Sequence, residues 1–195
     1  MKPILIVAPA IEPVSLVEAK AWLRLDGSDE DDLVQALIVS ARLTLEAYTR
    51  RFFVTQSWRL TVDAWPSSAR DRASATIAIP LAPFQSVAAI RVFDAGGVAQ
   101  LLPAATYRAP PANDCARIVF SSSPPAPGRQ FDGIEIDIVV GYGVLALNTP
   151  EPLRRAMLTL VSHWHEHRGD GRADEAALPA AVAVLAKPFR RERLI

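Results

Sequence analysis

Residues 12–20, near the start of the chain, read Glu-Pro-Val-Ser-Leu-Val-Glu-Ala-Lys and mark the beginning of a helix. Ser15 and Glu18 have the spacing of a capping box. In such a box the serine oxygen accepts a hydrogen bond from a free backbone amide, and the glutamate reaches back to the amide of the capping residue. The spacing therefore predicts that a helix begins just after Ser15.

A second and longer helix is predicted after a break at Asp26 and Gly27. Acidic side chains occupy residues 29–32, where the dipole of a starting helix favours negative charge. Apolar side chains then recur at helical spacing. They are Leu33, Val34, Leu37, Ile38, Ala41, Leu45 and Tyr48. Arg50 and Arg51 close the last turn, so the N-terminal region is expected to form a helical hairpin in which nothing looks catalytic.

The middle of the chain, from about residue 55 to 145, is predicted to be rich in β-strands. Apolar and polar residues alternate over 58–62 and 134–140, which is typical of half-buried strands. Shorter apolar runs at 77–79, 87–93, 98–102 and 118–120 fit further strands. Asp94-Ala95-Gly96-Gly97 has the composition of a hairpin turn.

Helical spacing returns after Pro150, with an apolar face from Leu153 to Trp164, and a short helix is expected from Pro179 to Ala186. Helices at both ends with strands between them predict an α+β protein. We expect a single domain over 1–195, with helical parts at 12–52 and 150–195. They would form a bundle into which the antiparallel β-rich part is inserted.

Composition bounds the function. Half of the 195 residues are hydrophobic, and 21 basic residues balance 21 acidic ones, so the chain as a whole is not expected to bind polyanions. The single cysteine, Cys115, excludes an internal disulfide and fits a reducing compartment. The apolar run at 4–8 is too short for a membrane span and is expected to be an extended arm or an edge strand. No membrane partner is predicted.

The N-terminal pattern resembles the head–tail connector (adaptor) proteins of long-tailed bacteriophages and gene transfer agents. The resemblance lies in the order E-P-V-S-L-x-E-A-K-x-x-L-R-L, a D-D-x-L helix start, Ala41-Arg42, and Glu46 through Arg51. It continues in T-Q-S-W-R-L-T-V from Thr55, I-x-I-P-L-x-P from Ile77, V-G-Y-G from Val140, and the helix P-E-P-L-R-R-A-M-x-x-L-V-x-H-W. Only the segment from His165 to His167 departs from the pattern.

The resemblance implies a structural protein rather than an enzyme, with no cofactor. Such a protein would be assembled in the bacterial cytoplasm and end in a virion or phage-like particle. There it would form a ring beneath the portal protein, most simply of twelve copies, extend the DNA channel and join the capsid to the tail. Its partners would be the portal, neighbouring copies and the next tail-proximal connector or stopper protein, and DNA would only pass through.

The C-terminal tail is the predicted portal-binding segment. From Lys187 onward it carries four positive and one negative side chain, a net charge of +3, and it ends in apolar residues. A solvated chain end and a docking peptide both fit this composition. The resemblance favours docking, because adaptors of this kind insert their C-terminal segment into the portal ring. The residues concerned are Lys187, Pro188, Phe189, Arg190, Arg191, Arg193, Leu194 and Ile195.

Two alternatives follow from single features of the sequence. His163 and His167 lie one helical turn apart and could share a divalent ion in a small metal-dependent enzyme, although the order of residues is not H-E-x-x-H. The β-rich part could instead be a module that binds a small ligand, in which case Trp58 and Trp65 would line a concave aromatic patch. Neither alternative explains the N-terminal pattern.

Overall fold

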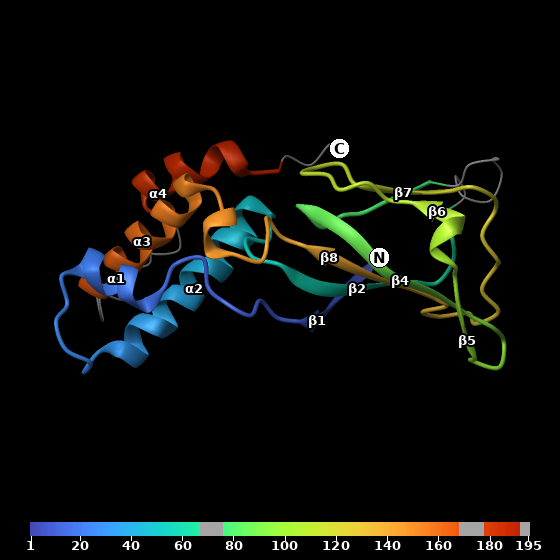
Figure 1. Ribbon diagram of the computed structural model, residues 1–195, viewed down its shortest axis with the longest axis horizontal. Helices are drawn as coiled ribbons and strands as arrows, with labels where there is room; N and C mark the ends of the chain where they lie inside the picture. The colour runs from blue at the N-terminus through green and yellow to red at the C-terminus, as the bar shows by residue number, and fades with distance from the viewer. Residues whose placement is uncertain (67–75, 168–177, 192–195) are drawn as a thin grey trace. The chain divides into compact units, whose positions relative to one another are not determined.

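The computed structural model describes residues 1–66, 76–167 and 178–191, and the chain divides into two compact units (Figure 1). The strand-rich unit contains Met1–Pro9 and Thr55–Gly141, and the helical unit contains Ala10–Val54 and Tyr142–Ile195. The α+β class predicted from the sequence is confirmed. The expectation that all 195 residues form a single domain stays a prediction.

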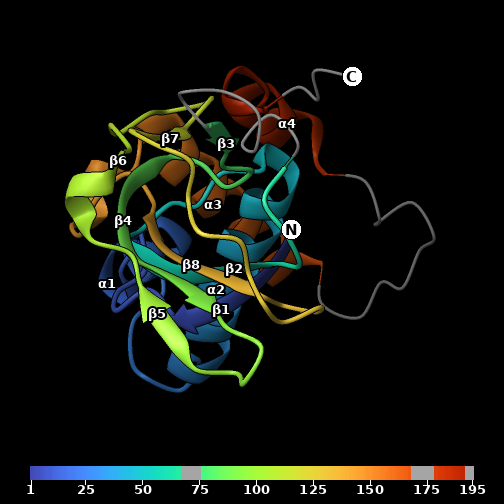
Figure 2. The same cartoon turned by 90° about the vertical axis from the view of Figure 1, so that its right-hand side faces the viewer.

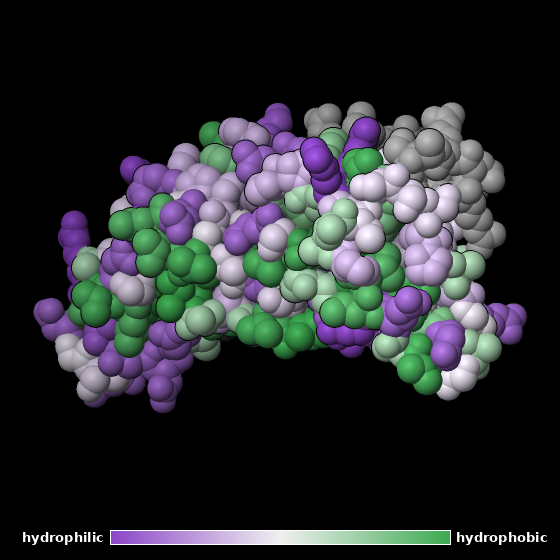
Figure 3. All heavy atoms as spheres, turned by 45° about the vertical axis from the view of Figure 1, so that its right-hand side comes forward, coloured by the Kyte–Doolittle hydropathy of each residue, from purple (hydrophilic) through white to green (hydrophobic). Residues whose placement is uncertain are grey.

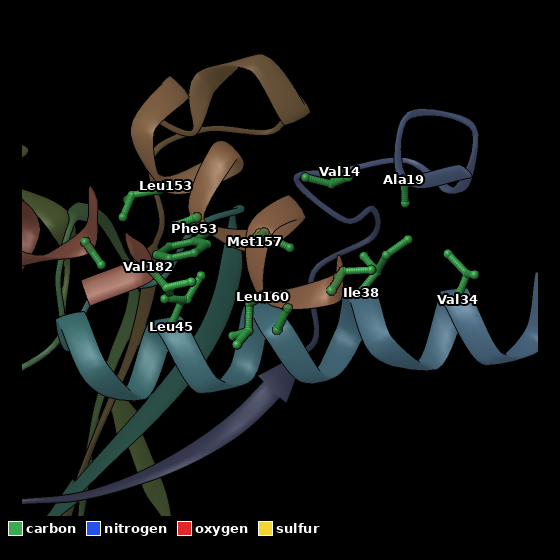
Figure 4. Close-up of a cluster of buried hydrophobic side chains, with 14 residues drawn as sticks. Val14, Ala19, Val34, Ile38, Leu45, Phe53, Leu153, Met157, Leu160 and Val182 are labelled. Carbon is green, nitrogen blue, oxygen red and sulfur yellow. The ribbon is translucent and has the colours of Figure 1, made fainter. Parts of the chain in front are cut away.

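The helical unit is built from four α-helices in the described part of the chain: α1 (Leu16–Leu23), α2 (Asp31–Thr49), α3 (Glu151–Glu166) and α4 (Ala180–Ala186). Figure 4 shows Ile38 and Leu45 of α2 on the side of the helix that faces Met157 and Leu160 of α3, with Val34 on the same side below Ala19. Ala19 of α1, Val182 of α4 and Phe53 complete the same buried cluster. Because these residues recur at helical spacing, one face of each helix is buried against the others.

The observed face of α2 differs from the predicted one at its first turn. Leu33 is exposed, whereas Val34, Ile38, Ala41 and Leu45 are fully buried as expected. The buried stripe also contains charged residues, Arg42 and Glu46, which lie one turn apart beside Ala41 and Leu45. The core of this unit therefore has a polar component that the apolar pattern alone did not reveal.

The described residues of the strand-rich unit form two antiparallel sheets. The larger sheet has the order β1-β2-β8-β4-β5, formed by Lys2–Val7, Gln56–Val62, Ile134–Val140, Phe84–Phe93 and Ala99–Leu101. Figure 2 shows this sheet obliquely, with β1 and β5 at its margins. The smaller sheet has the order β3-β7-β6, formed by Thr76–Ala78, Arg117–Phe120 and Tyr107–Arg108. The apolar run after Lys2 is thus an edge strand, one of the two forms expected.

Alternation along β8 separates the two faces of the larger sheet. Ile134, Ile136 and Ile138 are fully buried, while Glu135 and Asp137 between them are half-buried on the other face. Trp65 and Phe120 meet edge to face, with ring centroids 5.3 Å apart, in the core of the unit. This is the pattern of a sheet with one apolar and one polar face.

The two-residue strand β6 was not predicted, because Tyr107 and Arg108 are too few to show any period. Among the described residues, no helix is both long and apolar enough to cross a membrane.

Candidate functional site

The predicted capping box at the start of α1 is present and is connected to α3. The Glu18 amide donates to Ser15 Oγ over 3.2 Å, and the Ser15 amide donates to Glu18 Oε2 over 2.8 Å. Glu18 Oε1 forms an ion pair with Arg154. Burial raises the pKa of Glu18, but hydrogen bonds from Ser15 and the charge of Arg154 lower it by more, so that the pKa lies below its ordinary value.

Arg154 is the buried residue through which α3 holds the N-terminal segment. Its Nε donates to the Pro13 carbonyl over 2.9 Å, and its Nη1 lies 2.8 Å from Glu151 Oε2. The guanidinium therefore has partners on α1, on α3 and on the segment that precedes α1. Because an arginine has five donors in a fixed geometry, it can join three chain segments at once.

A second polar cluster surrounds Arg42 of α2. Its Nε donates to Glu12 Oε2 over 2.7 Å, and its Nη1 donates to Glu46 Oε2 over 3.1 Å. Burial lowers the pKa of Arg42, but these two carboxylates raise it by more. Burial also raises the pKa of Glu46, and its bonds to Arg42 and the Phe53 amide offset this only in part.

Glu46 extends this cluster to the turn that follows α2. Its Oε1 accepts the Phe53 amide over 2.8 Å, and the Phe53 carbonyl in turn accepts from Thr149 Oγ1 and the Tyr142 amide, each over 3.2 Å. Sequence reasoning did not identify this function for Arg42 and Glu46. The available signal was a pair of opposite charges, four residues apart, on the apolar face of a predicted helix.

The polar face of the larger sheet carries a network of four charged residues across its central strands. Arg59 on β2 donates to Asp137 over 2.7 and 3.0 Å and lies 3.1 Å from Glu135. Arg91 on β4 lies 2.5 Å from Asp137. Burial raises the pKa of Asp137, but the two arginines lower it by more, so that the pKa lies below its ordinary value.

The described part of the predicted portal-binding segment contacts the helical unit itself. Lys187–Phe189 form a short 3₁₀-helix, and Phe189 packs against the helical core. Arg51 Nε donates to the Phe189 carbonyl over 2.5 Å, and the Arg191 amide donates to the Thr49 carbonyl over 3.0 Å. The segment therefore begins at a fixed place, beside the C-terminal end of α2.

The side chains of the segment are only partly available to a partner. Lys187, Pro188 and Arg190 are exposed, and the Arg190 guanidinium lies 5.2 Å from the centre of the Tyr48 ring. Arg193, Leu194 and Ile195 lie outside the described residues. Docking by this segment stays a prediction.

The histidines of α3 are engaged with their own helix and with a neighbouring loop. The rings of His163 and His167 stack with centroids 4.4 Å apart, and His167 Nδ1 lies 2.8 Å from the His163 carbonyl oxygen. His165 Nε2 lies 2.7 Å from Glu30 Oε2. Among the described residues, no group of three or more histidine, cysteine or acidic side chains is placed to hold a metal ion.

The two tryptophans proposed for a ligand site point to different surroundings. Trp65 is buried, and its Nε1 donates to the Pro125 carbonyl over 2.7 Å. Trp58 is half-buried on β2, and its Nε1 donates to Gln56 Oε1 over 3.1 Å. A pocket of the strand-rich unit is lined mainly by Leu101, Leu102, Pro103, Phe120, Pro124 and Pro125, and by no tryptophan.

Exposed aliphatic side chains are frequent on both units, and Figure 3 shows them in green among polar residues on one face. On the strand-rich unit they include Ile4, Leu5, Ile6 and Val7 of β1 and Leu101 of β5. On the helical unit they include Val144, Leu145 and Leu147 of the loop before α3. Exposed apolar patches of this kind are typical of surfaces that bind other proteins.

Comparison with known proteins finds similarity to phage connector proteins and to chains of gene transfer agent particles. The family model of the phage gp6-like head-tail connector proteins matches residues 13–79. A chain from the neck of an empty gene transfer agent particle, computed with C6 symmetry, is similar with a TM-score of 0.81 and 27% sequence identity. The match covers 100% of this chain and 98% of that chain. No curated protein matches the sequence.

Two further solved structures are similar over the same share of both chains, 100% of this one and 98% of the other. One is a chain from the virion of a native gene transfer agent particle, with a TM-score of 0.79 and 26% identity. The other is from the neck of a native particle computed with C12 symmetry, with a TM-score of 0.75 and 25% identity. The resemblance read from the sequence is thereby confirmed.

Proposed function

Since this chain carries the sequence of a phage gp6-like head–tail connector over residues 13–79 and the fold of gene transfer agent neck chains throughout, we propose that it is a structural adaptor. It acts at the head–tail junction of a phage or phage-like particle. There it joins the capsid to the tail and extends the channel through which DNA passes. The observation that carries this proposal is the match to a neck chain over 100% of this chain and 98% of the other.

A ring of copies is supported by the symmetry of the similar necks. Those structures were computed with sixfold and twelvefold rotational symmetry. Copies related by rotation meet through two different surfaces, and the contact closes into a ring when the rotation fits. We propose twelve copies, arranged around the axis of the portal. The work of such a ring is mechanical, and it requires neither a catalytic centre nor a cofactor.

The portal protein is the proposed partner of the C-terminal segment, Lys187 to Ile195. Its start is fixed by the hydrogen bonds from Arg51 to the Phe189 carbonyl and from the Arg191 amide to the Thr49 carbonyl. A segment that leaves from a fixed point loses less conformational entropy when it docks than a wholly free tail would. Its net charge of +3 would pair with carboxylates of the portal, and its terminal aliphatic residues would serve as anchors.

The opposite side of the ring is proposed to receive the next tail-proximal connector or stopper protein. An adaptor must hold two different partners under load, which requires well-anchored chain segments. The clusters around Arg42 and Arg154 meet this requirement, because each joins segments that are far apart in the sequence.

Binding to the portal protein of the same particle tests the proposal. Full-length chain is compared with a version that ends at Arg191, which keeps every described contact of Phe189 and Arg191 with the helical unit. We expect the full-length chain to bind and the shortened one to lose most of its affinity. Binding should also weaken as salt is raised, since charge pairs at accessible surfaces are screened.

Either of two results would contradict part of this proposal. If the full-length chain does not bind its portal, the adaptor function is wrong. If both forms bind equally, the chain is an adaptor but the residues after Arg191 are not needed for docking, which then uses residues 187–191 or another surface. Replacing exposed Arg24 by alanine provides a control, because this residue lies at the end of α1 and outside the proposed segment.

A further inference from the structure

Among the described residues, β1 and β5 are the two edge strands of the larger sheet, and both expose aliphatic side chains. On strand β1, between 41% and 56% of the surface of each of Ile4, Leu5, Ile6 and Val7 is accessible to solvent. Strand β5 exposes Leu101 at 62%, and Val98 just before it is exposed at 67%. An edge strand offers unpaired backbone groups to any chain that can lie beside it.

The two edge strands, β1 and β5, run in the same direction along the sheet. Every neighbouring pair in the order β1-β2-β8-β4-β5 is antiparallel, and an odd number of strands separates the ends of this series. The register places Lys2 level with Thr61, Glu135, Arg91 and Leu101, so β1 begins level with the last residue of β5. The hairpin that leads into β5 lies beyond that level, at the same end of the sheet. When one copy is placed beside another by rotation, β1 of the first can meet β5 of the second in parallel orientation.

The two edges also carry opposite charges at this end of the sheet. Lys2 is exposed at the start of β1, and Asp94 is exposed in the hairpin before β5. Asp94 Oδ1 accepts the Val98 amide over 2.9 Å, and neither residue forms an ion pair within the described part of the chain. In a head-to-tail contact, Lys2 of one copy would lie near Asp94 of the next.

We propose that β1 of one copy packs against β5 and the Asp94–Val98 hairpin of the neighbouring copy, so that the sheets of successive subunits form part of the ring. This inference rests on the proposed function, because a rotationally symmetric ring requires two different surfaces on each chain that are complementary to one another. The occupant of each edge is a second copy of this chain. Apolar side chains and the Lys2–Asp94 pair are the recognition elements.

The contact consists mainly of side chains and includes few backbone hydrogen bonds. Strand β5 has three residues, Pro3 has no N–H to donate, and the register of β1 shifts between Leu5 and Val7. Such features limit uncontrolled pairing of edge strands. They allow a closed ring while they discourage open-ended fibres.

Cysteine cross-linking tests this arrangement directly. Cys115 is exposed and is first replaced by serine, which leaves a chain without thiols. Leu5→Cys and Leu101→Cys are then introduced singly and together, and the complexes with the portal protein are oxidised or treated with a short bismaleimide. We expect the double variant to give a ladder of covalent oligomers. Each single variant should give monomers, and an equal mixture of the two should give dimers.

The remaining outcomes are informative in different ways. Dimers of Leu5→Cys alone would show that like edges meet, which overturns the head-to-tail contact. Rings that form on the portal but give no cross-link to Leu101→Cys, when Leu5, Ile6 and Val7 are each replaced by cysteine in turn, would also overturn it and leave the proposed function intact. If the thiol-free chain forms no complex with the portal, the proposed function itself fails. Val184→Cys paired with Leu101→Cys is the control. Val184 is an exposed aliphatic residue like Leu5, but it lies on α4, outside the proposed contact, so we expect no cross-link.

Charge exchange gives an independent measurement. Lys2→Glu and Asp94→Lys should each weaken ring assembly, by about two- to five-fold per contact, which is the range for exposed ion pairs. The double variant should recover the loss. Equal assembly by all four proteins would show that these side chains do not meet.

Discussion

At the scale of single residues, the stability of the helical unit depends on a few charged side chains that are buried together. Replacing Glu46 by leucine removes the acceptor of the Phe53 amide and one of the two carboxylates of Arg42. Breaking a buried pair from one side leaves polar groups unsatisfied, so we expect a loss of about 3 kcal/mol in the free energy of unfolding. Urea denaturation of the Glu46→Leu variant and the unchanged chain measures this difference in the free energy of unfolding.

The matched control for this change is Glu166→Leu on the surface of α3. Glu166 is exposed, and its Oε1 accepts a hydrogen bond from the Ser162 hydroxyl of its own helix. Its replacement should change the free energy of unfolding by less than about 0.5 kcal/mol. Similar losses in both variants would mean that the cluster around Arg42 adds little to stability.

Asp137 on the polar face of the larger sheet predicts a dependence on pH. Its pKa is below the ordinary value in the folded chain, so the folded state binds fewer protons than the unfolded one. The stabilisation is therefore complete above the unfolded pKa of about 4 and is lost as the pH falls through the folded pKa. Asp137→Asn should cost about 1–2 kcal/mol at pH 7, with the difference from the unchanged chain shrinking below about pH 4.

Chemical denaturation between pH 3 and pH 7 checks this prediction, with Asp26→Asn in an exposed loop as the control. A difference that stays constant over the whole range would contradict the assigned cause, which is the pairing of the ionised carboxylate with Arg59 and Arg91.

At the scale of elements, the ends of the helices are set locally. Ser15→Ala removes the side-chain acceptor of the Glu18 amide, and loss of such a cap costs about 1 kcal/mol. Ser40→Ala, at an exposed position within α2, should be neutral or slightly stabilising, because alanine has the higher helix propensity. Thermal or urea unfolding of the two variants separates the free energy lost with the cap from the general effect of replacing a serine by alanine. Equal effects would show that the box is not energetically important.

A comparison of the predicted and observed elements shows which features local sequence patterns can predict. The strands with clear alternation, such as β8, and the helices with marked ends were predicted close to their observed bounds. Strand β6 was missed, because two residues carry no period. The buried positions of Arg42, Glu46 and Arg154 were missed for a different reason. A charged side chain is buried only when its partners are close, and those partners come from distant parts of the chain.

At the scale of the whole molecule, the balance of 21 basic and 21 acidic residues predicts weak contact with DNA. Binding to duplex DNA depends chiefly on basic side chains that displace counterions from phosphates. We therefore expect the purified chain to leave the anisotropy of a labelled duplex unchanged at physiological salt. Clear binding at that salt would mean that basic residues are concentrated on one surface, and the channel would then bind DNA as it passes.

The amino-acid sequence was enough to predict the helix starts, the alternating strands, the order of helical and strand-rich parts, and the resemblance to head–tail connectors. These follow from local spacing and from motif order, which need no knowledge of distant residues. The folded structure was needed to show that Arg42 and Arg154 bind the segment before α1, and that Phe189 packs against the helical core. It also decided that β1 and β5 form the two open edges of one sheet. The physical reason is that such contacts join residues far apart in the chain, and their geometry exists only once the elements have packed.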